Sequence, residues 1–193
     1  EFHCGGKENI YGFTISDERP HGTVNPRKII AYSCNVGMAL ASRNLGKGAL
    51  YEILKKYALG QETGLLLPGE EKGSIRIPSK MTMRSMISIP IGQEVGLTPI
   101  QLVSAFTALA NDGELLAPRI IEKVEHRGQS VEVFPVIKKG KVLSKQVART
   151  MLSYMEDVVN TGTGKDARIP GVKMAGKTGT AQIFDSQSRT YSK

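Results

Sequence analysis

Residues 171–181, GVKMAGKTGTA, constrain the fold of this chain more than any other segment. Their G-x-x-x-x-G-K-T pattern matches a phosphate-binding loop, which must leave a buried strand and enter a helix directly. The same residues can instead form a strand that carries Lys177. The two interpretations require different backbones, so the neighbouring residues can distinguish them.

The flanking residues favour the strand. Pro170 stands where the entering strand of a phosphate loop would end, and proline lacks the N–H that a central strand needs. The residues after Lys177 are rich in β-branched and aromatic types, and Gly179 occupies what would be the first helical turn. The sequence also lacks a run of four apolar residues ending in aspartate, which would hold magnesium. We therefore predict a strand from about Val172 and disfavour a nucleotide hydrolase.

The chain has two cysteines, Cys4 and Cys34, and no C-x-x-C pair. A zinc site built from His3, Cys4, His21 and Cys34 is conceivable, but these residues lack the usual ligand spacing. The sequence therefore favours two free or buried thiols, with no metal site and no cofactor.

The length and charge indicate one ordinary globular domain. The chain has 193 residues and a net charge of +8, and one domain usually takes about 150 residues. Its basic residues are scattered, and the longest clusters, Lys55-Lys56 and residues 138–141, contain no aromatic side chain. This pattern is typical of a solvated surface, so we predict no nucleic-acid partner. The chain has no signal peptide and no apolar stretch of membrane-spanning length. Because it begins with Glu1 and not with methionine, we expect a fragment.

Local signals predict several elements in the first half of the chain. Residues 1–24 are expected to form loops, and Asn25-Pro26 resembles an N-cap followed by the first helical position. The apolar run up to Leu40 predicts one or two buried helices, with residues 33–35 at their junction. A helix over 47–59 that stops at Gly60, then irregular structure over 61–90, completes this half.

The second half contains the clearest helix signal. Thr98-Pro99-Ile100-Gln101 forms a capping box, and the helix that follows is apolar enough to be central and buried. A hairpin is predicted to turn at Arg127-Gly128, and residues 161–164 (Thr-Gly-Thr-Gly) are predicted to form a flexible loop. A last helix spans residues 144–160, with these side chains predicted to face inward: Val147, Met151, Leu152, Met155 and Val159.

Several motifs, in this order, resemble the transpeptidase domain of class B high-molecular-weight penicillin-binding proteins. They are Ser33-x-Asn35, GQEVGLTPIQL at 92–102, Asn-Asp-Gly at 111–113, the 161–164 loop, and Lys177-Thr178-Gly179. Each motif alone is weak, but their order is specific, and the resemblance covers essentially all of residues 1–193 as one partial domain. It implies an α+β fold of the penicillin-binding protein and serine β-lactamase type, with helices packed on an antiparallel sheet, present as an incomplete copy.

The resemblance also implies site roles. Ser33 would relay a proton to the leaving amine, and Asn35 would hold the substrate's amide. Lys177 would attract the substrate's terminal carboxylate by its charge, assisted by the hydroxyls of Thr178 and Thr180. Gly179 would let a peptide lie against the strand edge, and the Thr180 N–H would donate to the oxyanion. Each residue also has an ordinary structural interpretation, such as a helix cap for Ser33 and an exposed surface position for Lys177.

One departure from the family is important. The family's nucleophile lies in a Ser-x-x-Lys motif upstream of Ser-x-Asn, and no Ser-x-x-Lys occurs in these 193 residues. The chain is therefore expected to carry half of an active site and to be inactive alone. Cys34 is not expected to replace the missing serine, because no histidine stands in a suitable context.

The resemblance further implies the partners and the location. The parent protein would bind peptidoglycan stem peptides and β-lactam antibiotics, and would contact other cell-wall synthesis proteins. A membrane anchor upstream would hold it at the outer face of the bacterial cytoplasmic membrane. The alternative is a non-catalytic relative, either a β-lactam sensor or an envelope scaffold.

Overall fold

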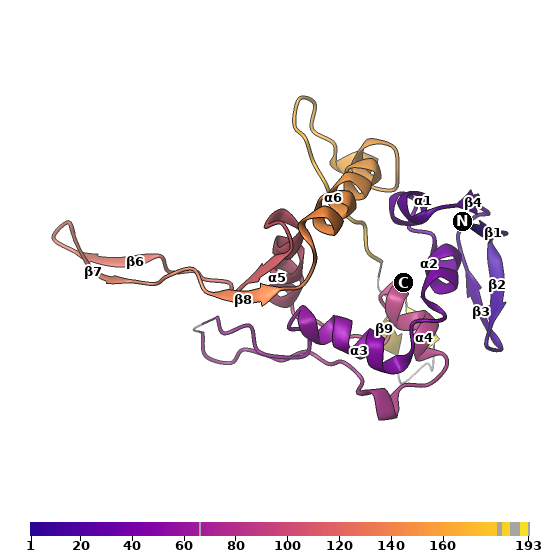
Figure 1. Cartoon of the computed structure of the whole chain (residues 1–193), viewed down its shortest axis with the longest axis horizontal. Helices are drawn as coiled ribbons and strands as arrows, with labels where there is room; N and C mark the ends of the chain where they lie inside the picture. Colours follow the sequence, from indigo (N-terminus) through magenta and orange to yellow (C-terminus); the bar gives the residue numbers. More distant parts are fainter. Residues whose placement is uncertain (66, 181–182, 186–189, 193) are drawn as a thin grey trace. The chain divides into compact units, whose positions relative to one another are not determined.

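The computed structural model describes residues 1–65, 67–180, 183–185 and 190–192 (Figure 1). The chain divides into two compact units. Unit 1 contains residues 1–51, 76–95 and 152–193, and unit 2 contains residues 52–75 and 96–151. Because unit 1 is built from three separated segments, residues far apart in the sequence meet within it.

Unit 1 begins with four short strands rather than the predicted loops. β1 (Phe2–Cys4) pairs antiparallel with β4 (Gly22–Val24), and β2 (Lys7–Ile10) pairs with β3 (Phe13–Ser16). The second hairpin turns through Tyr11 and Gly12, whose φ angles of 56° and 81° are both positive. Such two-residue turns usually contain Asn-Gly or Asp-Gly, so Tyr-Gly gives little signal. The loop prediction for residues 1–24 is wrong for this reason.

One or two helices are predicted after Asn25, and the structure has two. α1 (Pro26–Ala31) begins with the Asn25 side chain accepting a hydrogen bond from the Lys28 N–H at 3.0 Å, and α2 (Asn35–Ser42) follows after a short junction. α2 packs against β1, β2, β3 and α4 (Ser85–Ser88). The core beside it consists of Cys4, Val24, Ile29, Cys34 and Val36. The junction between α1 and α2 therefore packs on a buried apolar core.

The remaining short helices differ from prediction. α3 (Lys47–Lys56) ends before the predicted stop at Gly60, because Ala58 already adopts a left-handed conformation with φ 56°. The region predicted as irregular contains η1 (Pro78–Lys80), α4 and η2 (Ile89–Ile91). Ile87, in α4, is completely buried, and this burial favours a short helix. The nearby prolines, in contrast, suggest a loop.

In unit 2, the predicted capping box is present at the start of α5 (Pro99–Ala110). The Thr98 hydroxyl accepts from the Gln101 N–H, and the Gln101 side chain accepts from the Thr98 N–H. Gln101 is 1% exposed and also donates to the carbonyls of Gln61 and Lys72, which ties the preceding loop to the helix. The expectation of a central, buried helix is wrong, since 58% of Val103 is exposed.

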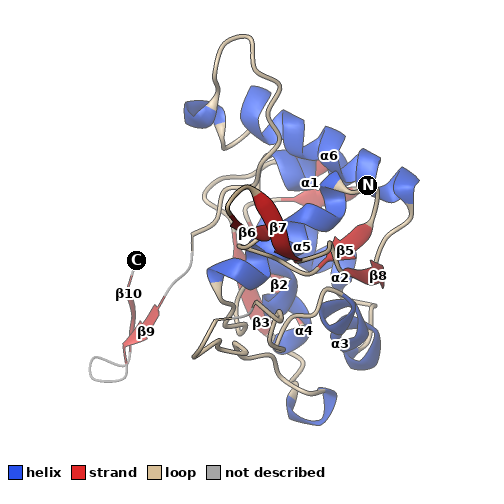
Figure 2. Cartoon of the chain, turned by 90° about the vertical axis from the view of Figure 1, so that its left-hand side faces the viewer, coloured by secondary structure: helices blue, strands red, loops and turns tan. Residues whose placement is uncertain are grey.

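The strands of unit 2 form two antiparallel pairs, β5 (Glu114–Leu116) with β8 (Lys138–Lys141) and β6 (Lys123–His126) with β7 (Gln129–Val133). The β6–β7 hairpin turns at Arg127-Gly128 as predicted, with φ angles of 49° and 78°. Every described strand pair is antiparallel. Groups of strands and groups of helices follow one another along the chain, and Figure 2 shows the helices in blue and the strands in red. The predicted α+β class is confirmed.

α6 (Lys145–Asn160) is confirmed, but not every residue predicted to face inward does so. Met155 and Val159 are buried, whereas 46% of Val147 is exposed. Near the start of the helix, Ala148 is buried instead of its neighbour Val147, so the inward face differs from the prediction by one residue at this position only. The described chain then continues through η3 (Lys165–Ala167), β9 (Ile183–Asp185) and β10 (Thr190–Ser192).

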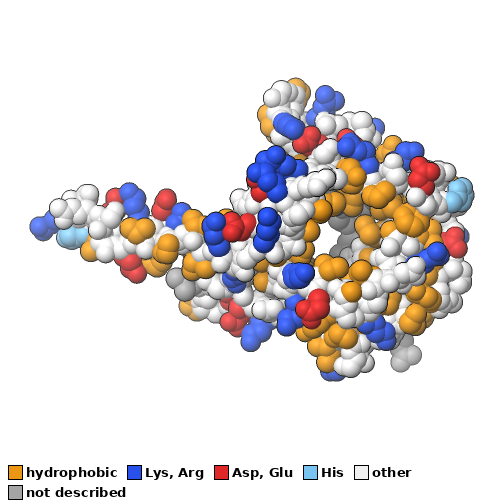
Figure 3. Space-filling model, in the orientation of Figure 1, with side chains coloured by type: hydrophobic (Ala, Val, Ile, Leu, Met, Phe, Trp, Pro, Cys, Tyr) orange, Lys and Arg blue, Asp and Glu red, His pale blue; other side chains and the backbone are white. Residues whose placement is uncertain are grey.

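The surface mixes charge with apolar side chains. On the face shown in Figure 3, lysines and arginines are interspersed with acidic and hydrophobic residues. Several basic residues have acidic partners: Lys138 contacts Glu114 at 2.9 Å and Lys123 contacts Glu125 at 2.7 Å. None of the described helices combines the length and the apolar character needed to cross a bilayer.

Candidate functional site

Ser33 lies at the sharp junction between α1 and α2. Its φ of 54° is left-handed, which is uncommon for a residue other than glycine. The Ser33 and Cys34 N–H groups donate to the carbonyls of Ile30 and Ile29, which closes the end of α1. This turn leaves the Ser33 side chain half-buried at the surface of unit 1.

Lys177 meets Ser33 across 144 residues of sequence. Its Nζ donates to the Ser33 Oγ at 2.7 Å and to the Thr178 carbonyl at 2.9 Å. The two motifs that the sequence paired by analogy are thus in direct contact. The contact gives Ser33 an ammonium partner, which is the arrangement that a proton relay requires.

The Lys177 ammonium has an altered acidity. The residue as a whole is exposed, but the protein around its amino group buries it in part, and this burial lowers its pKa below the ordinary lysine value of 10.5. Desolvation disfavours the charged form of an amine, so Lys177 releases its proton more readily than a surface lysine.

The predicted strand around Lys177 is wrong for the described residues. Residues 172–180 adopt neither strand nor helix, and β9 begins only at Ile183. A strand needs a neighbour to complete its hydrogen bonds, and no described strand pairs with this segment. Its backbone bonds are local or to α6, such as Gly176 N–H to the Met155 carbonyl at 3.2 Å. The helix required by a phosphate loop is also missing over 177–180, and residues 181–182 of the predicted strand lie outside the described residues.

Thr178 contacts Thr163, a residue for which the sequence predicts no role in the site. Its hydroxyl lies 2.7 Å from the hydroxyl of Thr163. The Thr163 N–H donates to the Ala31 carbonyl at 3.1 Å, and the Gly164 N–H donates to the Val158 carbonyl at 2.8 Å. The 161–164 loop, predicted as flexible, is therefore held between α1 and α6 beside the Ser33 junction.

The other predicted site residues occupy separate positions. Asn35 opens α2, with its N–H donating to Asp17 Oδ1 at 2.6 Å and its side-chain amide donating to the Ser16 carbonyl at 3.3 Å. Gly179 and Thr180 are exposed, and among the described residues, the two chain neighbours of Gly179 aside, no heavy atom lies within 4 Å of a Cβ built on Gly179. The structure thus joins Ser33, Lys177 and Thr178 by direct contacts and leaves open space beside Gly179.

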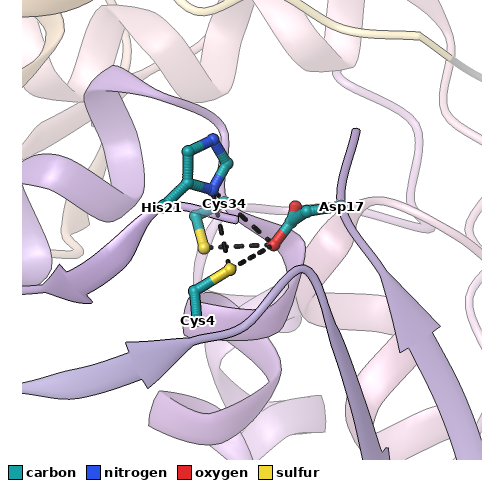
Figure 4. Close-up of side chains that lie close together, drawn as sticks. All are labelled: Cys4, Asp17, His21 and Cys34. Atoms are coloured by element: carbon teal, nitrogen blue, oxygen red, sulfur yellow. Dashed lines mark hydrogen bonds and ion pairs between the residues drawn. The ribbon is translucent and has the colours of Figure 1, made fainter. Parts of the chain in front are cut away.

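Asp17 is a supporting residue that the sequence did not indicate. Its carboxylate accepts the N–H groups of Asn35 and Val36, which are unpaired at the start of α2. Burial opposes the ionisation of Asp17, but hydrogen bonds from the Cys4 thiol (Figure 4) and these two amides outweigh it and lower the pKa. An ionised carboxylate at this helix start also suits the helix dipole, and so fixes the Ser33–Asn35 backbone.

Cys34 is unsuited to act as a nucleophile. It is 1% exposed and caps α2 by accepting the Gly37 N–H at 3.2 Å. Burial raises the pKa of the thiol, so it stays protonated at neutral pH. The prediction of a packed thiol at this position is confirmed.

Comparison with known proteins identifies the family of this chain. The model of the penicillin-binding protein transpeptidase domain matches residues 1–193. The chain belongs to this family. The resemblance to class B penicillin-binding proteins, carried by Ser33-x-Asn35 and Lys177-Thr178-Gly179, is thereby confirmed.

The relatives of this transpeptidase-family chain are much longer proteins. Penicillin-binding protein PbpB of Mycobacterium tuberculosis is 34% identical over 96% of this chain, which spans 29% of that relative. Peptidoglycan D,D-transpeptidase MrdA of Acinetobacter baumannii is 30% identical over 98% of the chain, which spans 30% of that relative. The crystal structure of penicillin-binding protein 3 from Mycobacterium tuberculosis, complexed with aztreonam, superposes with a TM-score of 0.89. It is 33% identical, with 98% of this chain and 44% of that chain covered. The fold expectation is confirmed.

Proposed function

We propose that this chain is part of the transpeptidase domain of a serine D,D-transpeptidase that cross-links peptidoglycan. It is the part that carries the Lys-Thr-Gly motif. The observation that carries the proposal is the 2.7 Å contact between Lys177 Nζ and Ser33 Oγ. It joins two motifs of a family whose members include a named peptidoglycan D,D-transpeptidase and a structure with bound aztreonam. The proposed ligands are D-Ala-D-Ala stem peptides and β-lactams.

In the proposed reaction, a serine outside these 193 residues attacks the substrate's carbonyl carbon and forms an acyl-enzyme, which an amine then resolves. Ser33, whose hydroxyl accepts a hydrogen bond from the Lys177 ammonium, relays the proton released by the attacking serine to the leaving amine, so that Lys177 keeps its charge. The charge of Lys177 also attracts the ligand's carboxylate. The hydroxyl of Thr178, oriented by its contact with Thr163, binds the same carboxylate. Asn35 binds the substrate's amide, and the Thr180 N–H donates to the oxyanion. The chain alone is inactive in this scheme.

The proposal extends to the surroundings of the chain. The gene upstream of Glu1 should encode the Ser-x-x-Lys motif, a pedestal region and a membrane anchor that holds the domain at the outer face of the cytoplasmic membrane. Other cell-wall synthesis proteins would bind the complete protein. The absence of Ser-x-x-Lys from the complete reading frame would instead favour an envelope scaffold.

Gly179→Leu tests whether a ligand lies beside this residue. Because space is open around a Cβ at this position, the substitution should leave the thermal midpoint of the full-length protein unchanged. A bulky side chain should nevertheless exclude a peptide-like ligand and lower the rate of labelling by fluorescent penicillin at least about tenfold. Gly179→Ala, the matched control, should label at nearly the wild-type rate. Equal labelling of the leucine and alanine variants would contradict the assignment.

The pH profile tests the charge of Lys177. The ammonium is charged below its pKa and neutral above it, and burial lowers that pKa from 10.5. We therefore expect the rate of acylation by a carboxylate-bearing penicillin to fall as the pH rises, with a midpoint below the usual lysine pKa of about 10.4. Stopped-flow acylation of the full-length protein between about pH 7 and pH 10.5 measures this. A rate that stays constant to the top of this range would contradict a role for the lowered pKa.

A further inference from the structure

The β6–β7 hairpin of unit 2 presents unpaired strand edges to the solvent (Figure 1). β6 and β7 form a sheet of two strands, and no other strand of the described residues pairs with either of them. Every residue of the two strands is exposed, including the three valines Val124, Val131 and Val133. The backbone groups along the outer edges therefore face water, and such an edge is a template on which another strand can pair.

The two edges differ, because β7 contains a bulge. Val131 has no residue opposite to it on β6. Its neighbours Ser130 and Glu132 pair with Glu125 and Val124, which are adjacent to each other. An extra residue bends its own strand and disrupts the regular spacing of the hydrogen-bonding groups. The edge of β7 is thus irregular, while β6 keeps the regular alternation that a new strand needs.

The backbone groups of β6 that face outward belong to Lys123 and Glu125. In an antiparallel pair, alternate residues direct their N–H and C=O groups toward the partner strand. The Glu122 carbonyl accepts the Phe134 N–H at 2.9 Å, so Glu122 and, two residues later, Val124 direct these groups toward β7. Lys123 and Glu125 therefore leave two N–H and two C=O groups that a further strand can bind.

The charges along this edge are complementary to those of a second copy of the same edge. Lys123 and Glu125 lie on one face of β6, with Lys123 Nζ 2.7 Å from Glu125 Oε1. A second β6, antiparallel and centred on Val124, would place each lysine opposite Glu125 of the partner subunit. The next pair would place the Glu122 carboxylate opposite the imidazole of His126. Opposite charges on opposed residues stabilise a sheet, whereas like charges destabilise it.

The hydrogen bonds and the symmetry favour the same alignment. Lys123 and Glu125 would form the hydrogen-bonded pairs, because their backbone groups face outward. Val124 would lie on the two-fold axis opposite its own copy, as a non-hydrogen-bonded pair with Cα atoms about 4.5 Å apart. Centring the two strands on Lys123 or on Glu125 instead would place that charge opposite itself. One alignment therefore satisfies both the backbone and the charges, and it uses the same surface on both subunits.

We propose that the edge of β6 is a self-association surface, on which the β6 strand of a second copy pairs antiparallel about Val124. The product is a four-stranded sheet in the order β7–β6–β6–β7. A single short strand buries less surface than a stable dimer usually does, so the dimer is weak, with a dissociation constant of about 10 μM or above. None of the residues assigned to the transpeptidase reaction lies on this hairpin.

Disulfide trapping tests the alignment. Val124→Cys would bring two thiols together across the two-fold axis, at a Cα separation that a disulfide can span. Under mild oxidation, the full-length variant should form disulfide-linked dimers on non-reducing gels at least about tenfold faster than Val133→Cys. Val133 is the matched control, because it lies on the outer strand of the proposed sheet. It is also the more exposed valine, at 63% against 45%, so reactivity by exposure alone would give the opposite order.

Charge reversal tests the complementarity, with trapping through Val124→Cys as the readout. Lys123→Glu and Glu125→Lys would each oppose like charges in a dimer of identical chains, so each should slow trapping at least about tenfold. An equimolar mixture of the two variants should regain nearly the original rate and give the mixed dimer, because every opposed pair then has opposite signs. Both positions are exposed, so the variants should fold.

Three outcomes would overturn the proposal. The first is equal trapping of Val124→Cys and Val133→Cys at protein concentrations above the expected dissociation constant. The second is a mixture of the two charge-reversed variants that is trapped no faster than either variant alone. The third is trapping of Val124→Cys in cells to a different protein and not to a second copy of itself.

Discussion

Lys177→Ala is expected to slow acylation of the full-length protein by fluorescent penicillin at least about 100-fold. Loss of a single group that stabilises charge in a transition state typically costs about 100- to 1,000-fold. Lys177 would make two such contributions in the proposed reaction: its ammonium donates to Ser33 Oγ at 2.7 Å, and its charge would attract the ligand's carboxylate. Labelling followed over time on gels gives the second-order rate constant.

Lys173→Ala is the matched control for this experiment. Lys173 lies four residues earlier on the same segment, has a side chain 81% exposed, and contacts Glu156 at 3.0 Å. Its removal takes away the same charge from the same part of the surface but should leave the rate of acylation close to wild type. Equal acylation rates for the two variants would contradict a specific role of Lys177. The slower acylation would then result from the loss of general electrostatic attraction.

The double variant Ser33→Ala/Lys177→Ala separates the two roles of Lys177. If the lysine acts partly through the Ser33 hydroxyl, the double variant should lose less than the product of the two single losses. Full additivity would limit Lys177 to binding the ligand's carboxylate. The rate constants of the two single variants and the double variant complete this cycle.

Gly162→Ala is expected to destabilise unit 1 by about 3 kcal/mol, near the upper end of the usual range for overpacking. A Cβ at this position would overlap the Ala31 carbonyl and lie 2.9 Å from Val158 Cα. Both obstacles are backbone atoms, so no side chain can rotate away to relieve the overlap. Thr163 would also move, because its N–H bond to Ala31 positions the hydroxyl that contacts Thr178.

Urea denaturation measures this effect as a lower midpoint with an unchanged slope. Gly5→Ala is the control, because a Cβ there meets no atom within 4 Å and the φ of Gly5 is not positive. It should change the free energy of unfolding by less than about 0.5 kcal/mol. A Gly162→Ala protein as stable as the control would show that the 161–164 loop is as loose as its sequence suggests.

Elements with local signals could be predicted from the sequence. Asn25 and Thr98 cap their helices through hydrogen bonds three residues away, and Arg127-Gly128 makes a turn whose geometry involves only its own residues. The sequence also predicted that Ser33 and Lys177 belong to one site, because both residues lie in motifs shared with a family. No local pattern alone would have paired residues this far apart.

The predictions that failed depend on non-local contacts. Composition favours a strand around Lys177, but a strand also requires a neighbour, and composition does not supply one. The apolar face of α5 predicts burial, yet Val103 remains exposed. Thr163 and Asp17 were missed because their importance comes from the partners that the fold places beside them. Neither residue carries a distinctive pattern of its own.

The division of unit 1 into three segments has a consequence for how the protein folds. Ser33 is synthesised 144 residues before Lys177, and both chain segments of unit 2 lie between them in the sequence. Closing so long a loop carries an entropic cost that local contacts do not repay, and non-local contacts form slowly. The N-terminal strands and α2 must therefore wait for the last segment before the Ser33–Lys177 contact can form. A growing chain released before residue 177 would have Ser33 without its Lys177 partner.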